Sequence, residues 1–521
     1  MRRSRWSLLS ICVCGTIAQA QSPANVLPPD LDSFVTSVMT EFRVPGIGLA
    51  IVKDGKALLT NGYGVRALGS SAPVDARTRF GIASNTKLFT ATAIGLLVEE
   101  GKLNWDSPVV RYMPSFAMYD AWVTREITVR DLLVHRSGLG LGAGDLLWWP
   151  QSTYDRKEIV RRLRFIAPAT SFRSAYAYDN VLYTVAGELI EAVSGMPWED
   201  FIAKRILGPA GMTGTSVRHS DAGRGENIAK THAEVDGLVR GVPPMEGDNV
   251  NPAGGINTSA EDIAKWLIVQ LDSGRLSDGR RLYQPATTVQ LWTLVTPIPA
   301  ATPAPELAFQ RGSFNGYGLG IGVRDYRGVQ MLTHTGALPG YYSRVTMIPG
   351  MKLGVAVLTN QESSPAYNAI VSRIVDHFLG ATPVDYLTIY RTVARRDRES
   401  VNASQTDFIA ARDSTARPTL PLSRYAGKYT DAWYGDIRIV DQNTRLAIRF
   451  SHTPSLVGDL VPWEKDTFLV RWRDRSLRAD AYLTFTLGPS GRVASATMKP
   501  ASPDVDFSYD FQDLLLKPIK R

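Results

Sequence analysis

Cysteine is almost absent from this sequence of 521 residues, which contains two. Cys12 and Cys14 both lie close to the N-terminus, so the rest of the chain has no disulfide and must be held together by its cores. The six histidines form no HExxH pair or comparable ligand spacing; they stand at positions 135, 219, 232, 334, 377 and 452. These absences argue against a disulfide scaffold and a metal centre, and we expect no metal or other cofactor.

Long apolar runs and basic patches are missing as well. No stretch beyond the N-terminal region is apolar enough to cross a bilayer, which takes about 20 residues. The formal net charge of +8 is mild for this length, and the pairs Arg161-Arg162 and Arg395-Arg396 are typical of solvated helix faces. We therefore expect no membrane span and no nucleic-acid partner.

The N-terminus has the pattern of a secretory signal. Three arginines among the first five residues precede an apolar stretch, residues 6–17, and the small-x-small sequence Ala18-Gln19-Ala20. We predict cleavage after Ala20, which removes the three arginines, leaves a net charge of +5 and places the protein in the periplasm or outside the cell.

Two alternatives to cleavage are disfavoured. An uncleaved anchor would need a longer apolar stretch than about twelve residues. A lipoprotein would be acylated at Cys12, but Ile11 is bulky at a position where such sites carry a small residue.

The length allows about three domains, at roughly 150 residues each. In residues 21–380 we predict helices over 30–43, 84–101, 181–193 and 260–271, and strands over 46–52, 57–65, 317–323, 329–333, 343–348 and 354–359. Strands near both ends with helices between them predict an α/β layer, whose sheet is closed by the N-terminal hairpin and a late antiparallel meander.

The last part of the chain has a different composition. Residues 381–420 are polar and charged, as expected of a partly helical connector. Residues 421–521 contain short alternating runs bounded by Gly, Pro, Asp and Asn, at 424–430, 434–440, 445–451, 466–472, 481–487, 491–498 and 506–511. About seven or eight strands over this length predict a small antiparallel β-barrel or sandwich.

Ser84 and Lys87 are the first candidate catalytic pair. In Ser84-Asn85-Thr86-Lys87, at the start of a predicted helix, one turn brings the Lys amine within reach of the Ser hydroxyl. A lysine in apolar surroundings loses proton affinity and can act as a base. Alone the motif is weak, because about one Ser-x-x-Lys is expected by chance and a capping Ser beside a solvated Lys is the simpler interpretation.

Two further motifs follow along the chain. In Tyr178-Asp179-Asn180, before a predicted helix, Tyr178 can shuttle a proton if nearby cations lower its pKa, and Asn180 can donate to a substrate carbonyl. His334-Thr335-Gly336 follows a predicted strand, and the small residues Gly336 and Ala337 would let a substrate backbone lie along the strand edge. Each motif alone is almost uninformative.

The order of the three motifs, at separations of 94 and 156 residues, is a far stronger signal. It resembles the serine β-lactamase and penicillin-binding-protein-like superfamily, most closely the branch of class C β-lactamases, D-alanyl-D-alanine carboxypeptidases, D-aminopeptidases and related esterases. The same branch is matched by VPG at 44–46, ITVRDLLVHRSGL at 127–139, LGPAGM at 207–212 and PAGG at 252–255. The resemblance covers about residues 30–380.

The resemblance implies a fold and a set of site residues. The fold is an α/β (α+β) β-lactamase-like fold, with an antiparallel sheet flanked by helices and an all-helical subdomain. Ser84 would attack an acyl carbonyl to give an acyl-enzyme, with Lys87 and Tyr178 managing protons. The substrate-binding residues would be Asn180, His334, Thr335, Gly336 and Ala337, with the backbone N–H groups of Ser84 and Ala337 holding the oxyanion.

Three other residues attract attention. His135 is tempting as a general base, yet in the family its His-x-Ser-Gly-Leu segment is a structural loop, and we prefer that interpretation. Trp148 and Trp149 are equally consistent with a wall of the substrate cleft and with an ordinary packed loop.

His334 departs from the pattern of class C β-lactamases, which usually carry Lys at this position. A mostly neutral imidazole binds a carboxylate less firmly than a lysine. We therefore expect an exported serine hydrolase that cleaves amide or ester bonds of D-amino-acid peptides or small esters. The alternatives are a class C-like β-lactamase with weak activity, and a β-lactam-binding sensor that is acylated without turnover.

The C-terminal segment begins with RYAGKY at 424–429 and resembles the lipocalin-like barrel appended to some exported members of this family. It offers no evident catalytic group. Three roles stay open for it, namely shielding the cleft, assembling protomers into a homo-oligomer and holding a small ligand.

Overall fold

The computed structural model describes residues 26–519, except residues 223, 301, 411, 414 and 444. The predicted signal segment, residues 1–20, lies outside the described residues. Among the described helices, none has the length and apolar character that crossing a bilayer requires.

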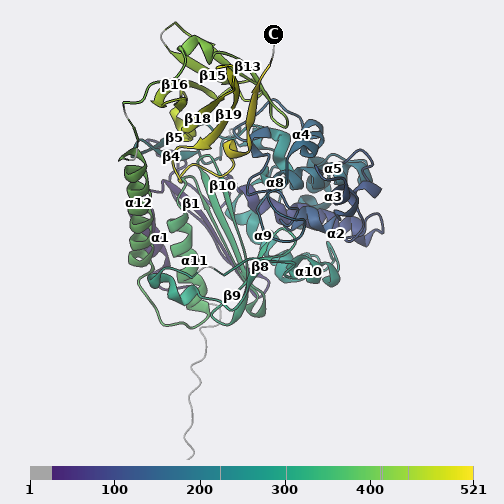
Figure 1. Ribbon diagram of the computed structural model, residues 1–521. Coiled ribbons are helices and arrows are strands. Elements are labelled where there is room, and N and C mark those ends of the chain that lie inside the picture. Colours follow the sequence, from purple (N-terminus) through teal and green to yellow (C-terminus); the bar gives the residue numbers. More distant parts are fainter. Residues whose placement is uncertain are drawn as a thin grey trace, which may run out of the picture.

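An antiparallel sheet forms the centre of the N-terminal part of the chain (Figure 1). Its order is β2-β1-β12-β11-β10-β9-β8-β7, so the N-terminal hairpin pairs with the last strand of the later meander, as predicted. The strands are β1 (Gly46–Lys53), β2 (Lys56–Gly64), β7 (Thr296–Pro297), β8 (Asn315–Tyr317), β9 (Gly322–Tyr326), β10 (Val329–Leu338), β11 (Tyr341–Ile348) and β12 (Leu353–Thr359).

Helices cover both faces of this sheet, which explains why β1 is buried along its length. Leu49 and Ile51 share an apolar cluster with α1 and α11, whereas Ala50 and Val52 share one with α9. Neighbouring residues of a strand point to opposite faces, so a strand covered on both sides is apolar throughout. The helices of this part are α1 (Leu31–Glu41), α2 (Lys87–Glu99), α3 (Ala121–Glu126), α4 (Arg156–Arg162), α5 (Val181–Ser194), α6 (Trp198–Ile202), α7 (Gly208–Ala210), α8 (Asn251–Gly254), α9 (Ala260–Leu271), α10 (Pro285–Trp292) and α11 (Ser364–Phe378).

Three expectations in this part were wrong in detail. The predicted helix over 84–101 begins with a 3-10 turn, Ala83–Thr86, and α2 starts at Lys87. The predicted strand over 317–323 is broken by a turn, in which Gly320 has a φ of +80° and an added Cβ would lie 2.7 Å from the Lys87 carbonyl oxygen. The strand expected to end at 333 continues as β10 through the His-Thr-Gly motif.

The C-terminal part is a closed barrel of eight antiparallel strands. They are β13 (Gly427–Asp431), β14 (Gly435–Asp441), β15 (Leu446–Phe450), β16 (Val457–Glu464), β17 (Thr467–Trp472), β18 (Ala481–Leu487), β19 (Val493–Pro500) and β20 (Leu515–Pro518). β16 was not predicted, because Gly458, Asp459 and Pro462 interrupt its pattern. The strand predicted over 506–511 is wrong, since those residues form an irregular connection between β19 and β20 that ends in a 3-10 turn, Phe511–Asp513.

The barrel is fixed at one end of the sheet by α12 (Tyr386–Ala410) and by polar contacts (Figure 1). Arg478 makes two hydrogen bonds to the Glu362 carboxylate, at 2.7 and 2.8 Å. Arg162 donates to the Trp433 carbonyl at 2.7 Å. One edge of the barrel lies over the C-terminal end of β10 and the start of α5, where the predicted site residues lie.

Candidate active site

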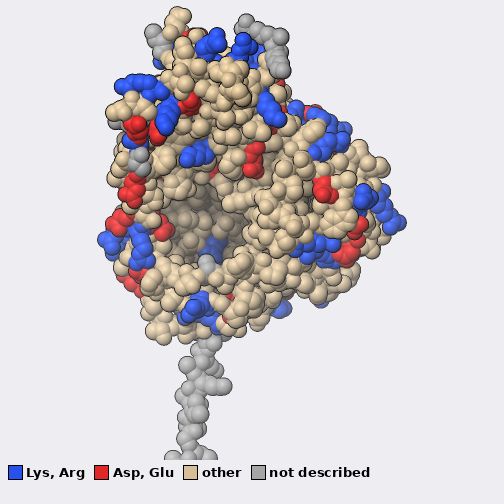
Figure 2. Space-filling view, viewed as in Figure 1, with Lys and Arg blue, Asp and Glu red and all other residues tan. Residues whose placement is uncertain are grey.

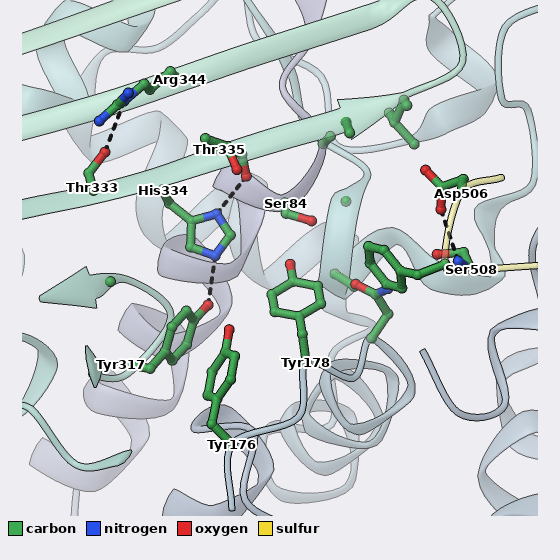
Figure 3. Close-up of a pocket in the computed structure, with 18 of the residues that line it drawn as sticks. Ser84, Tyr176, Tyr178, Tyr317, Thr333, His334, Thr335, Arg344, Asp506 and Ser508 are labelled. Carbon is green, nitrogen blue, oxygen red and sulfur yellow. Dashed lines mark hydrogen bonds between the residues drawn. The ribbon is translucent and has the colours of Figure 1, made fainter. Parts of the chain in front are cut away.

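A cavity of about 540 Å³ lies between the sheet, the start of α5 and the barrel. Figure 2 shows it as a deep hollow below the barrel, and Figure 3 shows the side chains that line it. Its lining includes Ser84, Trp148, Trp149, Tyr176, Tyr178, Asn180, Tyr317, His334, Thr335, Ala337, Asp506, Phe507 and Ser508. Motifs far apart in the sequence therefore meet in one cleft.

Ser84 is presented to the cavity by a turn that is held on two sides. The short strands β3 (Phe80–Gly81) and β6 (Asn257–Thr258) pair just before it, and the Ser343 hydroxyl donates to the Ile82 carbonyl at 2.8 Å. Ala83 has a φ of +49°, a conformation that L-residues adopt at a cost. These neighbouring contacts hold the turn in its strained conformation.

Gly336 explains how β10 approaches this turn. A Cβ at position 336 would lie 2.2 Å from the Ile82 carbonyl oxygen and 2.5 Å from the Ser343 hydroxyl. Only glycine fits, so β10 passes close enough to bring Thr335 and Ala337 to the cavity beside Ser84.

Lys87 is fully buried beneath Ser84. Its Nζ donates to the Ser84 Oγ at 3.0 Å, to the Asn180 Oδ1 at 2.8 Å and to the Ala253 carbonyl at 3.1 Å. Burial lowers the pKa of Lys87 to about 7, against the opposing attraction of the carboxylates Asp145 and Asp179. A substantial neutral fraction is therefore available near neutral pH.

Tyr178 lies over the same lysine, whose Nζ is 4.9 Å from the ring centre. Among the described residues its buried hydroxyl has no hydrogen-bond partner within normal distance. Burial raises the pKa of Tyr178 well above its ordinary value, and the nearby Ser84 hydroxyl lowers it only in part. The sequence motif predicts that Tyr178 shuttles a proton if nearby cations lower its pKa, but its pKa is raised. Tyr178 is therefore a neutral phenol that can donate a proton.

His135 lies behind the cavity and packs against Tyr178, with ring centres 4.2 Å apart and the ring planes tilted by 34°. Its Nδ1 accepts from the Asp179 backbone N–H at 3.1 Å, and burial lowers its pKa well below the ordinary value. It does not line the cavity, which favours the structural interpretation over a general base.

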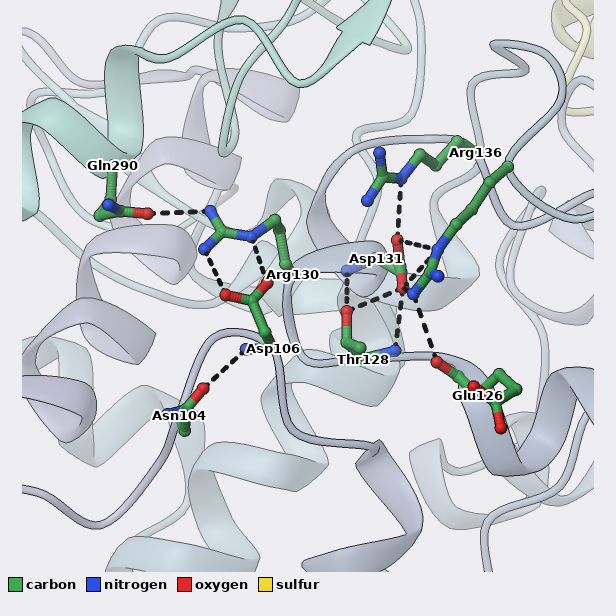
Figure 4. A network of polar contacts seen from close by, with 9 residues as sticks. Asn104, Asp106, Glu126, Thr128, Arg130, Asp131, Arg136 and Gln290 are labelled. Carbon is green, nitrogen blue, oxygen red and sulfur yellow. Dashed lines mark hydrogen bonds and ion pairs between the residues drawn. The ribbon is translucent and has the colours of Figure 1, made fainter.

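A polar network fixes the loop that carries His135 (Figure 4). The buried Asp131 carboxylate accepts from the Thr128 backbone at 3.0 Å, from the Thr128 hydroxyl at 2.7 Å and from Arg136 at 2.8 Å, and it also pairs with Arg173. Since Arg173 belongs to the segment that leads to Tyr178, one carboxylate ties together the two loops behind the cavity.

His334 is held by both ring nitrogens. Its Nδ1 lies 2.6 Å from the Thr335 carbonyl, which can only accept, so Nδ1 carries the proton and Nε2 accepts from the Tyr317 hydroxyl at 2.7 Å (Figure 3). Burial, and secondarily the charge of Lys87, lowers the pKa of His334 to about 3. The side chain is neutral at physiological pH.

The two ends of the cavity differ in charge. At the His334 end lie Arg324 and Arg344, whose hydrogen bonds go to neutral partners, Gln310, Thr333 and Asn368. Burial and the neighbouring Arg344 lower the pKa of Arg324. At the barrel end lies the carboxylic acid of Asp506, whose pKa is raised by burial.

Sequence reasoning missed three residues of this region. Asp145 is fully buried among the apolar residues that follow it in the chain, and a single acid in such a run is a signal of a buried, partnered carboxylate. Tyr317 shares a run of alternating glycines with Leu319 and Ile321, and this pattern favoured a strand with one bare face. Ser508 comes from the barrel, and no signal in its own segment indicated it.

Both parts of the chain are similar to known protein families. A family model described as Beta-lactamase matches residues 31–377, and a model for a domain of unknown function matches residues 411–518. An unguisins hydrolase of Aspergillus campestris is 29% identical over 496 residues, covering 91% of this chain and 90% of that protein.

Two solved structures share the fold. An octameric penicillin-binding protein homologue from Pyrococcus abyssi superposes with a TM-score of 0.58 at 23% identity, covering 94% of this chain and 99% of that one. A D-amino acid amidase from Ochrobactrum anthropi gives a TM-score of 0.53 at 23% identity, covering 67% and 98%. Because the family model spans more than half of the sequence, the chain belongs to the Beta-lactamase family and is a serine hydrolase of the β-lactamase and penicillin-binding-protein type.

Proposed function

We propose that this protein is an exported hydrolase that forms an acyl-enzyme at Ser84 and cleaves amide or ester bonds of D-amino-acid peptides or small esters. One observation carries the proposal: the Nζ of Lys87, with a pKa of about 7, lies 3.0 Å from the Ser84 Oγ inside the cavity. A neutral amine at hydrogen-bond distance can take the serine proton as the oxygen attacks.

The chemistry divides into two steps. In the first, Ser84 Oγ attacks the acyl carbonyl while its proton moves to Lys87, and the backbone N–H groups of Ser84 and Ala337 stabilise the oxyanion. Tyr178 then relays a proton to the leaving nitrogen or oxygen, giving its own proton as it takes one from the Lys87 ammonium, so that no free phenolate forms. In the second step a water molecule attacks the ester carbonyl, its proton follows the same route in reverse, and Ser84 is released with its hydrogen.

The cavity supports a small-molecule or short-peptide substrate. Its volume of about 540 Å³ suits a ligand of that size, and aromatic rings form much of its wall. Similar proteins include a D-amino acid amidase and an unguisins hydrolase, and both names describe hydrolysis. Arg324 and Arg344 supply positive charge at one end, so a substrate with a carboxylate meets these arginines instead of a charged residue 334.

Export and assembly are further parts of the proposal. The N-terminal signal pattern supports cleavage after Ala20, and sequencing the secreted protein from Gln21 would test it. A homo-oligomer is supported by the octameric homologue, which aligns with 94% of this chain, and our proposal is that the barrel forms the interface; the mass of the purified protein in solution would test whether it assembles.

The central experiment is a substrate panel run on the wild type, on Ser84→Ala and on the control Ser70→Ala, which changes an exposed serine. D-alanyl amides, p-nitrophenyl acetate and nitrocefin are compared, and a fluorescent penicillin reports acylation. We expect turnover of amides and esters to exceed that of nitrocefin and to disappear in Ser84→Ala alone. Equal labelling of Ser84→Ala would refute the acyl-enzyme, faster nitrocefin turnover would favour a β-lactamase, and a label retained for hours would favour a sensor.

A further inference from the structure

A loop of the barrel enters the cavity. The connection between β19 and β20, residues 501–514, carries Asp506, Phe507 and Ser508 into the lining. The Phe507 ring meets the Tyr178 ring edge to face, with centres 6.0 Å apart. Figure 3 shows Asp506 and Ser508 on the far side of Tyr178 from Tyr317. We call residues 501–514 the cleft loop.

Ser508 is linked to Ser84 by an unbroken series of hydrogen bonds. Its hydroxyl donates to the Asp145 Oδ2 at 2.8 Å, and the same oxygen accepts from the Asn180 Nδ2 at 2.8 Å. The Asn180 Oδ1 accepts from the Lys87 Nζ at 2.8 Å, and that amine reaches the Ser84 Oγ at 3.0 Å. Every linking side chain between the two serines is at most 4% exposed.

Asp145 determines which way the Asn180 amide points. Burial raises the pKa of Asp145 to about 7, and in its ionised form this carboxylate only accepts, so that the NH2 group of Asn180 faces Asp145 and its carbonyl oxygen faces Lys87. The reversed amide would place two donors against each other at the lysine. The other oxygen of Asp145 accepts from the Trp148 indole at 2.8 Å, so both carboxylate oxygens are engaged.

The cleft loop is fitted closely to the turn that carries Asp145. Asp510 accepts from the Gly144 backbone N–H at 2.7 Å. Gly142 has a φ of +69°, and a Cβ there would lie 2.7 Å from the Phe507 carbonyl oxygen. The barrel therefore contacts this turn through backbone as well as side chains, and a buried hydrogen bond at its centre is held in place.

We propose that Ser508 of the barrel is a positioning residue for Lys87, acting through Asp145 and Asn180, so that the barrel completes the catalytic apparatus. This gives a role to a module whose family model has none assigned, and it rests on the proposed function of Ser84 and Lys87. Without the Ser508 hydroxyl, Asp145 loses one of its three side-chain donors, and the Asn180 amide is held less firmly against the lysine.

Loss of the Ser508 hydroxyl should shift the pKa of Lys87 in one direction, downward. The Ser508 hydrogen bond lowers the pKa of Asp145 against the effect of burial, so its loss favours the protonated acid. A less ionised Asp145 stabilises the Lys87 ammonium less, and the pKa of Lys87 falls further. The other groups that face Lys87 or Asp145 are unchanged by this substitution; they are Asp179, His135, His334, Tyr178, Tyr183 and Asp510.

The test compares Ser508→Ala with Ser502→Ala in the full-length protein. Ser502 belongs to the same loop, but its hydroxyl accepts from the Asp504 backbone at 3.2 Å and not from the groups around Lys87, so it controls for general effects on the loop. The pH dependence of kcat and kcat/KM is measured with a neutral ester, beside the melting temperature of each variant.

For Ser508→Ala we expect kcat to fall about tenfold, as loss of one buried hydrogen bond implies, with KM within about twofold and the acidic limb of kcat/KM moved to lower pH. Ser502→Ala should match the wild type. A wild-type kcat and acidic limb in Ser508→Ala, a change in KM alone, or an equal effect of Ser502→Ala would overturn the proposal. Activity retained in Ser84→Ala would instead defeat the proposed function itself, so the two failures are distinguishable.

Discussion

The Tyr317 hydroxyl donates to Nε2 of His334 at 2.7 Å, and this contact completes the hydrogen bonding of the imidazole ring in the third motif. With Nδ1 committed to the Thr335 carbonyl, the ring has neither a free donor nor a charge to offer. The neutral site that replaces the lysine of class C β-lactamases is therefore held by a tyrosine that sequence reasoning missed.

The acidic limb of kcat/KM should belong to Lys87 and to the buried acids coupled to it, Asp145 and Asp179, whose pKa values burial also brings to about 7. As the pH falls through about 7, Lys87 gains a proton and can no longer accept one from Ser84, so activity on a neutral ester should be lost below that pH. His334, with a pKa of about 3, stays neutral throughout, so His334→Gln should leave the limb in place even if it lowers the rate. A limb that disappears in His334→Gln would contradict this assignment. The measurement is kcat/KM from pH 5 to 9.

Tyr317→Phe should cost about 1 kcal/mol of stability, because it leaves the buried Nε2 of His334 without its donor. We also expect kcat/KM to fall severalfold, since the ring is no longer held at both nitrogens. Denaturant unfolding and ester kinetics measure the two effects. Tyr283→Phe, which removes a buried hydroxyl outside the cavity lining, is the control for activity and should leave kcat/KM unchanged.

Asp131→Asn should destabilise the protein by about 3 kcal/mol, because it removes the buried charge that pairs with Arg136 and Arg173. Asp106→Asn is a matched control, since this acid pairs with Arg130 but its side chain is 68% exposed, and it should cost less than about 1 kcal/mol. Equal losses in denaturant unfolding would contradict the role given to Asp131.

The ionisation of Asp131 should make the stability of the protein depend on pH. Burial alone would raise the pKa of Asp131, but the hydrogen bonds from Arg173 and Thr128 outweigh it, and the pKa is lowered. The stabilisation is therefore present above the unfolded-state pKa of about 4 and is lost as the pH falls through the folded-state value. The gap in stability between wild type and Asp131→Asn should narrow in acid.

Arg344→Gln should weaken binding of substrates that carry a carboxylate. We expect KM for such a peptide to rise about tenfold while KM for its C-terminal amide changes little, because a charge-assisted hydrogen bond is lost only with the anion. Arg311→Gln, which changes an exposed arginine outside the cavity lining, should affect neither substrate. An equal rise in KM for both substrates would show that Arg344 has only a structural role.

Gly336→Ala should remove activity by at least about a hundredfold, since the new Cβ would push β10 away from the turn that carries Ser84. Gly350→Ala, in the connection between β11 and β12, has open space and is the control. Rates and melting temperatures are measured together. A lost rate at an unchanged melting temperature indicates displacement of the turn, whereas a lowered melting temperature indicates unfolding. A Gly336→Ala enzyme with normal rates would show that the close approach of β10 is dispensable.

Sequence patterns predicted the sheet, its hairpin and the barrel because each depends on periodicity within short segments. They also singled out Ser84, Tyr178 and Asn180, which line one cleft, and Lys87, which is buried beside them. Ser84 and Lys87 are one turn apart, so a local pattern describes their contact.

The contacts between the N-terminal part and the barrel could not be predicted from such patterns. Residues 506–511 alternate polar and aromatic side chains and were predicted as a strand, but Phe507 packs on Tyr178 and Tyr509 packs on Trp149. An alternating pattern indicates that one face of a segment is buried, but it does not identify the part of the protein that covers this face. Asp145 and Ser508 are 363 residues apart, and no local rule connects them.

The position of the barrel relative to the sheet depends on the length of helix α12. Its 25 residues span about 37 Å along the side of the molecule, packing on α1 and α11, and the barrel follows it (Figure 1). At its far end Phe408 stacks on Trp463 of the barrel, so the helix is a rigid spacer. One inserted residue would turn the attachment by about 100° and lengthen it by about 1.5 Å. Natural variation in this connector is therefore expected to accept substitutions on its exposed side and to resist insertions and deletions.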